Sequence, residues 1–284
     1  TLIYLLYNDV KKGIMILVYG LIVAFIALFT ITFFLLIIFI NYANKLSLMD
    51  IPNTRSSHKS PVARGAGIVF GFVFLFTLLL FDIFLLESYA YYYVFLALSI
   101  VFLTGVYDDF KDITSRKKFL FIILATTLAF YGGFSIDSLG NYFGYEVKLG
   151  YFALPFTIFA VVGFTNALNL TDGLDGLAGS ISVVILLSLL YLGIENSDSI
   201  LIYAPIFLLG PLIAFLWFNW YPAKVFMGDS GSLFLGFSIA MMSIYALKYI
   251  NPTAILFLAA IPLLDTLMVM SRRKQRKTVF ICSR

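Results

Sequence analysis

The sequence predicts an all-α, polytopic integral membrane protein, and three observations support that fold class. Of its 284 residues, 62% are hydrophobic and 12% are charged, whereas a soluble domain has roughly 45–50% apolar and about 25% charged residues. The apolar residues form long runs, and the first, at 14–40, is far longer than the apolar core of a signal peptide. Polar loops separate these runs. We therefore expect a single polytopic membrane domain over 1–284, embedded in the lipid bilayer.

Nine apolar segments are long enough to span a membrane, at about 20 residues per span. No repeat, low-complexity tract or linker interrupts them, so a second domain is not expected. The expected spans lie roughly at 14–40, 66–86, 90–107, 117–134, 151–168, 176–194, 200–218, 232–250 and 252–271.

The charged residues indicate the orientation of these spans. When loops are assigned alternately to two sides, fifteen of the 19 Lys and Arg residues fall on one side and four on the other. The basic side is cytoplasmic by the positive-inside rule, which places the amino terminus outside, with Lys11 and Lys12 as exceptions. We expect a bacterial-type inner (plasma) membrane protein. The balance of 19 basic to 15 acidic residues is too mild to indicate a nucleic-acid partner.

Two cytoplasmic loops combine charge with small polar residues. The loop 50–67 carries Arg55, His58, Lys59 and Arg64, which suit either phosphate recognition or anchoring at anionic lipid heads, and neither reading is favoured. His58 is the single histidine, so hydrogen bonding is a better expectation for it than metal binding.

The loop 105–119 places Asp108 and Asp109 side by side at the mouth of an apolar span. Adjacent carboxylates repel unless a cation or basic side chain lies near, and ionisable groups at membrane depth are candidates for function. The alternative is a set of interfacial ion pairs, in which these aspartates and Asp112 meet the neighbouring Lys and Arg residues.

The segment 166–179 places two amides and two carboxylates at a spacing of three residues. If it is helical, Asn166, Asn169, Asp172 and Asp175 share one face, and such oxygen donors suit Mg²⁺. The alternative is a polar loop with capping aspartates.

Asp229 lies between Gly228 and Ser230 just before an apolar run, where it can cap a helix or hold a metal ion. Carboxylates, amides and basic groups thus converge on one side of the membrane. This combination is a signature of phosphoryl transfer with a divalent metal, and the apolar helices favour a lipid substrate.

The loops DIPNTRSSHKSPVARGAGI, GVYDDFKD, NALNLTDGLDGLAG and FMGDSGSLFLG, in this order, resemble the polyprenyl-phosphate N-acetylhexosamine-1-phosphate transferase family. That family includes phospho-N-acetylmuramoyl-pentapeptide transferase, and the first loop is most similar to the O-antigen and capsule branch. Members continue beyond the position of Arg284, so the resemblance implies that a carboxy-terminal segment is missing.

The resemblance implies that undecaprenyl phosphate attacks a UDP-N-acetylhexosamine and releases UMP, with Mg²⁺ as cofactor and Mn²⁺ as a substitute. It implies that Asp229 and Asn169 bind the metal ion and that Asp108 and Asp109 are catalytic, with a base role toward the lipid phosphate. Substrate binding is implied for Asp172, Asp175, Asn166, Lys118, Arg64 and His58.

Two other functions remain as alternatives. A cation-coupled transporter would use the aspartates as a transport site, although transport sites usually lie near the bilayer midplane. A CDP-alcohol phosphotransferase would need a fuller aspartate pattern. The sequence leaves the UDP-sugar and the oligomeric state open, and a homodimer is compatible with it.

Overall fold

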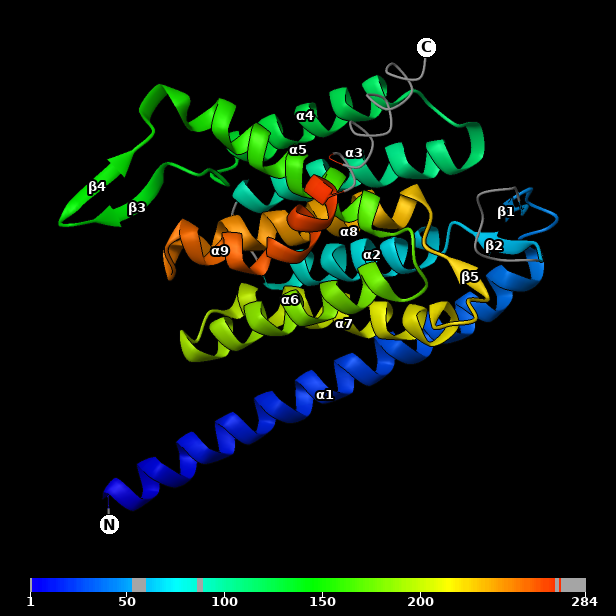
Figure 1. Cartoon of the computed structure of the whole chain (residues 1–284). Helices are drawn as coiled ribbons and strands as arrows, with labels where there is room; N and C mark the ends of the chain where they lie inside the picture. The colour runs from blue at the N-terminus through cyan, green and yellow to red at the C-terminus, as the bar shows by residue number, and fades with distance from the viewer. Residues whose placement is uncertain (1, 53–59, 86–88, 269–270, 272–284) are drawn as a thin grey trace.

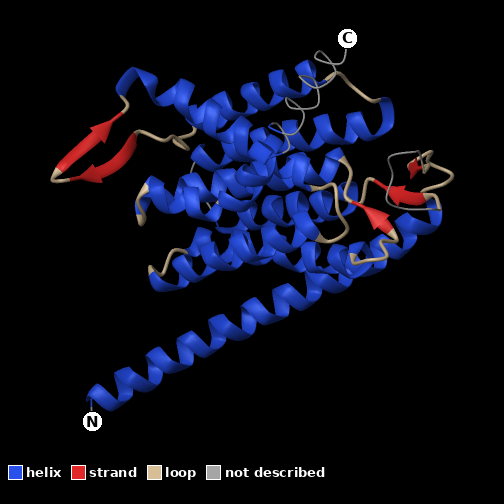
Figure 2. Ribbon diagram, in the orientation of Figure 1, coloured by secondary structure: helices blue, strands red, loops and turns tan. Residues whose placement is uncertain are grey.

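The structure is a computed structural model, and it describes residues 2–52, 60–85, 89–268 and 271. Within these residues the chain is a helical bundle with short strands at its two ends (Figure 1 and Figure 2). The predominance of helix agrees with the predicted class. The helices are α1 (Leu2–Tyr42), α2 (Gly67–Leu85), α3 (Tyr89–Lys111), α4 (Ser115–Tyr131), α5 (Ala153–Thr171), α6 (Leu177–Glu195), α7 (Ser199–Asn219), α8 (Asp229–Tyr245) and α9 (Pro252–Leu258).

Six of the nine expected spans coincide with helices that are long and apolar enough to cross a membrane, counted within the described residues. These helices are α1, α3, α5, α6, α7 and α8. For 66–86, 117–134 and 252–271 the span remains a prediction. The last of these is not one continuous helix, because α9 ends at Leu258 and helical backbone resumes at 260–268 after a turn at Ala259.

The prediction of an all-α chain missed two small sheets. At one end of the bundle, β1 (Met49–Asp50) pairs antiparallel with β2 (Val62–Arg64), and β2 pairs parallel with β5 (Val225–Phe226). At the opposite end, β3 (Ser138–Tyr142) and β4 (Tyr145–Lys148) form an antiparallel hairpin, which projects beyond the helices in Figure 1.

Helix α8 is the central column of the bundle. Every residue from Ser230 to Ile244 is buried, and the helix packs against α2, α3, α5 and α6. Aromatic rings fill the contact, since the Phe234 ring lies 5.8 Å from that of Phe74 and 5.5 Å from that of Phe102, both edge-on. Such edge-to-face pairs add to the free energy of apolar burial.

Glycines allow α2 and α3 to approach the first turn of α8. A Cβ atom on Gly67 would lie 1.9 Å from the backbone nitrogen of Gly231, and one on Gly105 would lie 2.5 Å from the carbonyl oxygen of Asp229. Any side chain at either position would push the helices apart. Because Asp108 and Asp109 follow Gly105 by about one helical turn, this crossing brings both carboxylates to the start of α8.

At the opposite end of the bundle, Asp198 joins α7 to the end of α8. Its Oδ1 accepts hydrogen bonds from the amides of Ile200 (2.9 Å) and Leu201 (3.0 Å), which makes it the N-cap of α7. Its Oδ2 accepts from the hydroxyls of Tyr249 (2.7 Å) and Tyr245 (3.2 Å). Burial alone would raise the pKa of Asp198, but these four hydrogen bonds outweigh it and hold the pKa below its ordinary value.

We expect Asp198→Ala to lower the free energy of unfolding by about 1 kcal/mol at pH 7, the usual cost of losing an aspartate cap. Because the pKa is lowered in the folded state, this stabilisation is complete above the ordinary aspartate pKa of about 3.9 and disappears as the pH falls through the folded value. In detergent solution, the unfolding temperature of the variant should therefore lie below that of the unmodified protein at pH 7, and the difference should be smaller at pH 3.

The exposed neighbour Glu195 provides the control, and Glu195→Ala should unfold like the unmodified protein at both pH values. If Asp198→Ala lowers the unfolding temperature equally at pH 7 and pH 3, the lowered pKa of Asp198 does not contribute to stability as expected.

Candidate active site

Arg64 reaches the start of α8 because of the parallel pairing between β2 and β5. Arg64 is the last residue of β2 and aligns with Phe226, three residues before Asp229. The chain then continues with the amides of Gly65 and Ala66, which both donate to the carbonyl oxygen of Phe226 at 3.1 Å. The Arg64 guanidinium lies 3.5 Å from Asp109 and 3.9 Å from Asp229.

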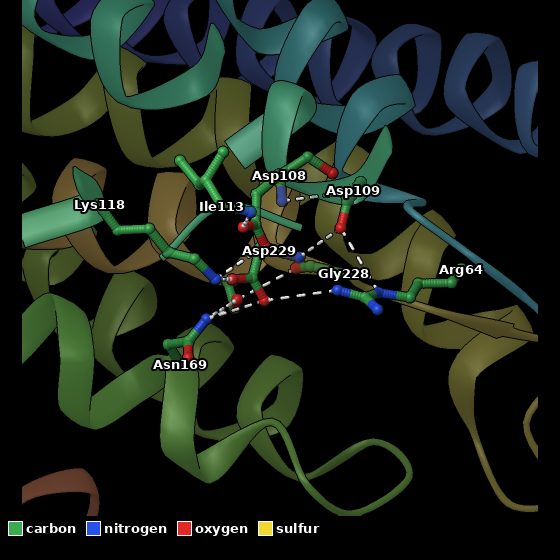
Figure 3. A network of polar contacts seen from close by, with 10 residues as sticks. Arg64, Asp108, Asp109, Ile113, Lys118, Asn169, Gly228 and Asp229 are labelled. Carbon is green, nitrogen blue, oxygen red and sulfur yellow. Dashed lines mark hydrogen bonds and ion pairs between the residues drawn. The ribbon is translucent and has the colours of Figure 1, made fainter. Parts of the chain in front are cut away.

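Asp108 and Asp109, at the end of α3, point to different partners (Figure 3). Asp108 Oδ1 accepts from the amide of Ile113 at 2.8 Å, and its Oδ2 accepts from the ammonium of Lys118 at 2.7 Å. Asp109 accepts from two amides of α8, those of Asp229 at 2.9 Å and Ser230 at 3.1 Å. The two adjacent carboxylates therefore avoid repulsion by facing different donors.

Lys118 is the cation that joins two of the aspartates. It lies in the first turns of α4, and its ammonium donates to both Asp108 and Asp229. The predicted ion pairing of the loop 105–119 is thus present for Asp108, and Lys118 extends it to a carboxylate 111 residues later in the chain.

Asn169 reaches the cluster from the last turns of α5. Its Nδ2 donates to the hydroxyl of Ser232 at 2.7 Å and to Asp229 Oδ1 at 3.3 Å. Asn166 lies about one turn earlier on the same helix, and within the described part of the chain no hydrogen bond or ion pair joins its side chain to the cluster.

The expected single face of amides and carboxylates does not form, because α5 ends at Thr171 and Asp172 caps its end. Burial, together with the carboxylates of Asp229 and Asp109, raises the pKa of Asp172 well above its ordinary range. A carboxyl group with a raised pKa can donate a hydrogen bond as well as accept one. Asp175 instead accepts from the amide of Ala223 at 3.0 Å, which fixes the loop.

Asn219 is a positioning residue that the sequence analysis missed. Its side chain is 3% exposed, and it accepts from the amide of Gly176 and donates to the carbonyl oxygen of Val225, both at 2.9 Å. Gly176 has a φ of +73°, a conformation that favours glycine. Asn219 thereby ties the loop that carries Asp172 and Asp175 to the strand that precedes Asp229. Its one sequence signal is an amide at the end of an apolar run, just before Trp-Tyr-Pro.

The structure brings six of the predicted site residues into one network, which Figure 3 shows around Asp229. Asp172 and Asp175 lie in the adjoining loop, while His58 lies outside the described residues. The reading of Asp229 as a helix cap is wrong, because Gly228 occupies the cap position and Asp229 is the first residue of α8. The six predicted residues that form the network are Arg64, Asp108, Asp109, Lys118, Asn169 and Asp229.

The network leaves one carboxylate open to a ligand. All three aspartates of the network have both oxygens engaged, but the side chains of Asp108 and Asp109 are 2% and 0% exposed, whereas that of Asp229 is 18% exposed. No group of three or more His, Cys, Asp or Glu side chains among the described residues is arranged to hold a metal ion. Mg²⁺ needs only one or two protein ligands when waters and substrate phosphates complete its octahedron. Asp229 and the amide oxygen of Asn169, after a half-turn of the amide, fit that smaller donor set.

Comparison with known proteins agrees with the four loop motifs. The sequence model of Glycosyl transferase family 4 matches residues 91–247, which is more than half of the chain. A probable undecaprenyl-phosphate N-acetylglucosaminyl 1-phosphate transferase of Bacillus subtilis (strain 168) is 34% identical over 179 residues, covering 61% of this chain and 50% of that protein.

Two streptococcal phospho-N-acetylmuramoyl-pentapeptide-transferases are also similar. The protein of Streptococcus equi subsp. equi (strain 4047) is 45% identical over 156 residues, covering 49% of this chain and 45% of the relative. That of Streptococcus pyogenes serotype M3 (strain ATCC BAA-595 / MGAS315) is 42% identical over 193 residues, covering 61% and 54%. The chain thus spans about half the length of the curated relatives it matches. The chain belongs to glycosyl transferase family 4, and the resemblance to polyprenyl-phosphate sugar-1-phosphate transferases read from its loops is confirmed.

Proposed function

We propose that this membrane protein transfers an N-acetylhexosamine-1-phosphate group from a UDP-sugar to undecaprenyl phosphate at the cytoplasmic face. The observation that carries the proposal is the network around Asp229, where one accessible carboxylate lies among an amide, an ammonium and a guanidinium group. The names of the relatives, which include an undecaprenyl-phosphate sugar-1-phosphate transferase, support the reaction class.

In the proposed reaction an oxygen of the lipid phosphate attacks the β-phosphorus of the UDP-sugar. The bond from that phosphorus to the bridging oxygen breaks, and UMP leaves with the electron pair. The second pKa of a phosphate monoester is about 6, so the attacking oxygen is already ionised at neutral pH and needs little help from a base. The protein mainly has to hold two anionic substrates together.

Basic side chains serve that purpose. Arg64 is 34% exposed and offers forked donors to a phosphate, while Lys118 offers a compact positive charge. The role we propose for Asp108 is to hold Lys118 in place, since its oxygens already accept from Lys118 and Ile113. Asp172 lies in the loop that adjoins the network, and we assign it to nucleotide binding.

Asp229 and Asn169 would hold Mg²⁺ or Mn²⁺ here. The ion would neutralise charge on the diphosphate as UMP leaves. Residues 166 and 175 contribute less directly in this proposal, because Asp175 fixes its own loop and Asn166 lies one turn away from the network. No feature of the described residues favours cation-coupled transport, because the carboxylates lie at the end of the bundle and not at its middle.

We expect membranes that contain the protein to release UMP from a labelled UDP-N-acetyl sugar when undecaprenyl phosphate and Mg²⁺ are present. Asp229→Ala should lower the rate at least roughly a hundredfold, as for other groups that stabilise transition-state charge. EDTA should stop the release, and Mg²⁺ or Mn²⁺ should restore it. A panel of UDP-N-acetylglucosamine, UDP-N-acetylgalactosamine, UDP-N-acetylfucosamine and UDP-N-acetylquinovosamine would identify the donor.

Glu195→Ala, which removes an exposed carboxylate at the far end of the bundle, serves as the control and should retain the unmodified rate. UMP release that continues unchanged in Asp229→Ala, or in EDTA, would refute the metal assignment.

Lys118→Met should make the folded protein depend on a divalent cation. Removing the ammonium leaves the buried Asp108 carboxylate next to Asp229 without a cation, and breaking a buried pair costs about 3–5 kcal/mol. Thermal unfolding without metal should therefore occur at a lower temperature, and added Mg²⁺ should raise it more than in the unmodified protein. Lys117→Met removes an exposed charge one residue away and should change neither value. If Mg²⁺ raises the unfolding temperature of both variants equally, a divalent cation does not replace the Lys118 ammonium between Asp108 and Asp229.

A further inference from the structure

We propose that Asp109 is a positioning residue: its carboxylate caps the first turn of α8 and thereby fixes the direction in which Asp229 faces. This inference rests on the proposed function for the role of Asp229. It separates two adjacent aspartates that the family resemblance treats as one catalytic pair.

The amides at the start of α8 need acceptors from outside the helix. The first four N–H groups of any helix have no partner within the helix. In α8, those of Gly231 and Ser232 donate to the carbonyl oxygen of Gly228 at 3.1 and 3.0 Å. Those of Asp229 and Ser230 donate to Asp109, at 2.9 and 3.1 Å. The Ser232 bond is the first i→i−4 bond of α8, and Asp109 accepts from two of the three α8 amides that precede it.

The cap position of α8 is occupied by a glycine. Gly228 has no side chain, so the helix lacks the local Ser, Thr, Asn or Asp oxygen that usually accepts these bonds. The carboxylate of Asp109 supplies both acceptors from a residue 120 positions earlier. Its negative charge also interacts favourably with the positive end of the helix dipole.

The Asp109 carboxylate lies close to the backbone of two glycines. A Cβ atom on Gly228 would lie 2.7 Å from both oxygens of Asp109, and one on Gly65 would lie 3.4 Å from Oδ2. Gly228 has a φ of +72°, so glycine is favoured there on conformational grounds as well. The Asp109 side chain is 0% exposed in this glycine-walled slot. A lipid phosphate therefore cannot reach its oxygens while α8 stays in place.

The cap is connected directly to the candidate metal ligand Asp229. Asp229 is the first residue of α8, so its backbone amide and its side chain belong to the same residue that Asp109 holds. Loss of the cap would let the first turn fray and would move the Asp229 carboxylate relative to Asn169 and Lys118. Side chains that orient a metal ligand typically contribute 10–100-fold to metal affinity.

Two measurements on detergent-solubilised protein test this role. Asparagine keeps one acceptor and places an NH₂ donor against the other amide, so Asp109→Asn should speed hydrogen–deuterium exchange in the segment 227–233. It should also raise the dissociation constant for Mn²⁺, followed by electron paramagnetic resonance, roughly tenfold. Asp108→Asn, whose partners are Ile113 and Lys118, should leave exchange in 227–233 unchanged.

Gly228→Ala places a methyl group against the Asp109 oxygens, so it should reproduce both changes without altering Asp109 itself. It therefore serves if Asp109→Asn does not accumulate in membranes.

Unchanged exchange in 227–233 in either Asp109→Asn or Gly228→Ala would overturn the proposal, and so would unchanged Mn²⁺ affinity combined with lost UMP release. The exchange measurement needs neither substrate nor metal. Absence of UMP release from the unmodified protein would therefore refute the proposed reaction without deciding the role of Asp109.

Discussion

The buried start of helix α8 is the constraint on which the rest of the structure depends. A helix end inside protein must find acceptors for its amides, because water cannot supply them. Here the acceptor is a carboxylate that arrives on α3, and the glycines Gly67 and Gly105 make the approach sterically feasible. The close packing of α2 and α3 on α8 and the acceptor for its first amides thus occur at the same place. That place is the start of α8, which carries Asp229.

Much of the site could be predicted because its residues are chemically conspicuous. Asp108, Asp109 and Asp229 interrupt apolar runs, where a charge needs a reason, and Lys118 lies beside them in the chain. The helical class followed from composition in the same way, since a bilayer admits helices readily. What these local signals could not give was the direction of each side chain, which depends on how α3, α4 and α8 cross.

The features that were missed depend on contacts between distant segments. The pairing of β2 with β5 joins residues about 160 positions apart, and strands of two or three residues leave no periodic pattern to read. Asn219 looks like an ordinary helix end until Gly176 and Val225 are placed on either side of it. The end of α5 at Thr171 likewise leads into a loop that Asp175 and Asn219 hold through distant contacts.

Asp109 lies 120 residues before Asp229, the first residue whose amide it caps, and this separation affects the order of biosynthesis. At roughly 5–20 residues per second, a ribosome needs roughly 6 to 24 s to make the intervening chain. During that interval α5, α6 and α7 are made before α8 exists, and the carboxylate of Asp109 has none of its later helix to cap. Until α8 is made, this charge has to remain hydrated, so the candidate active site is among the last parts of the bundle to assemble.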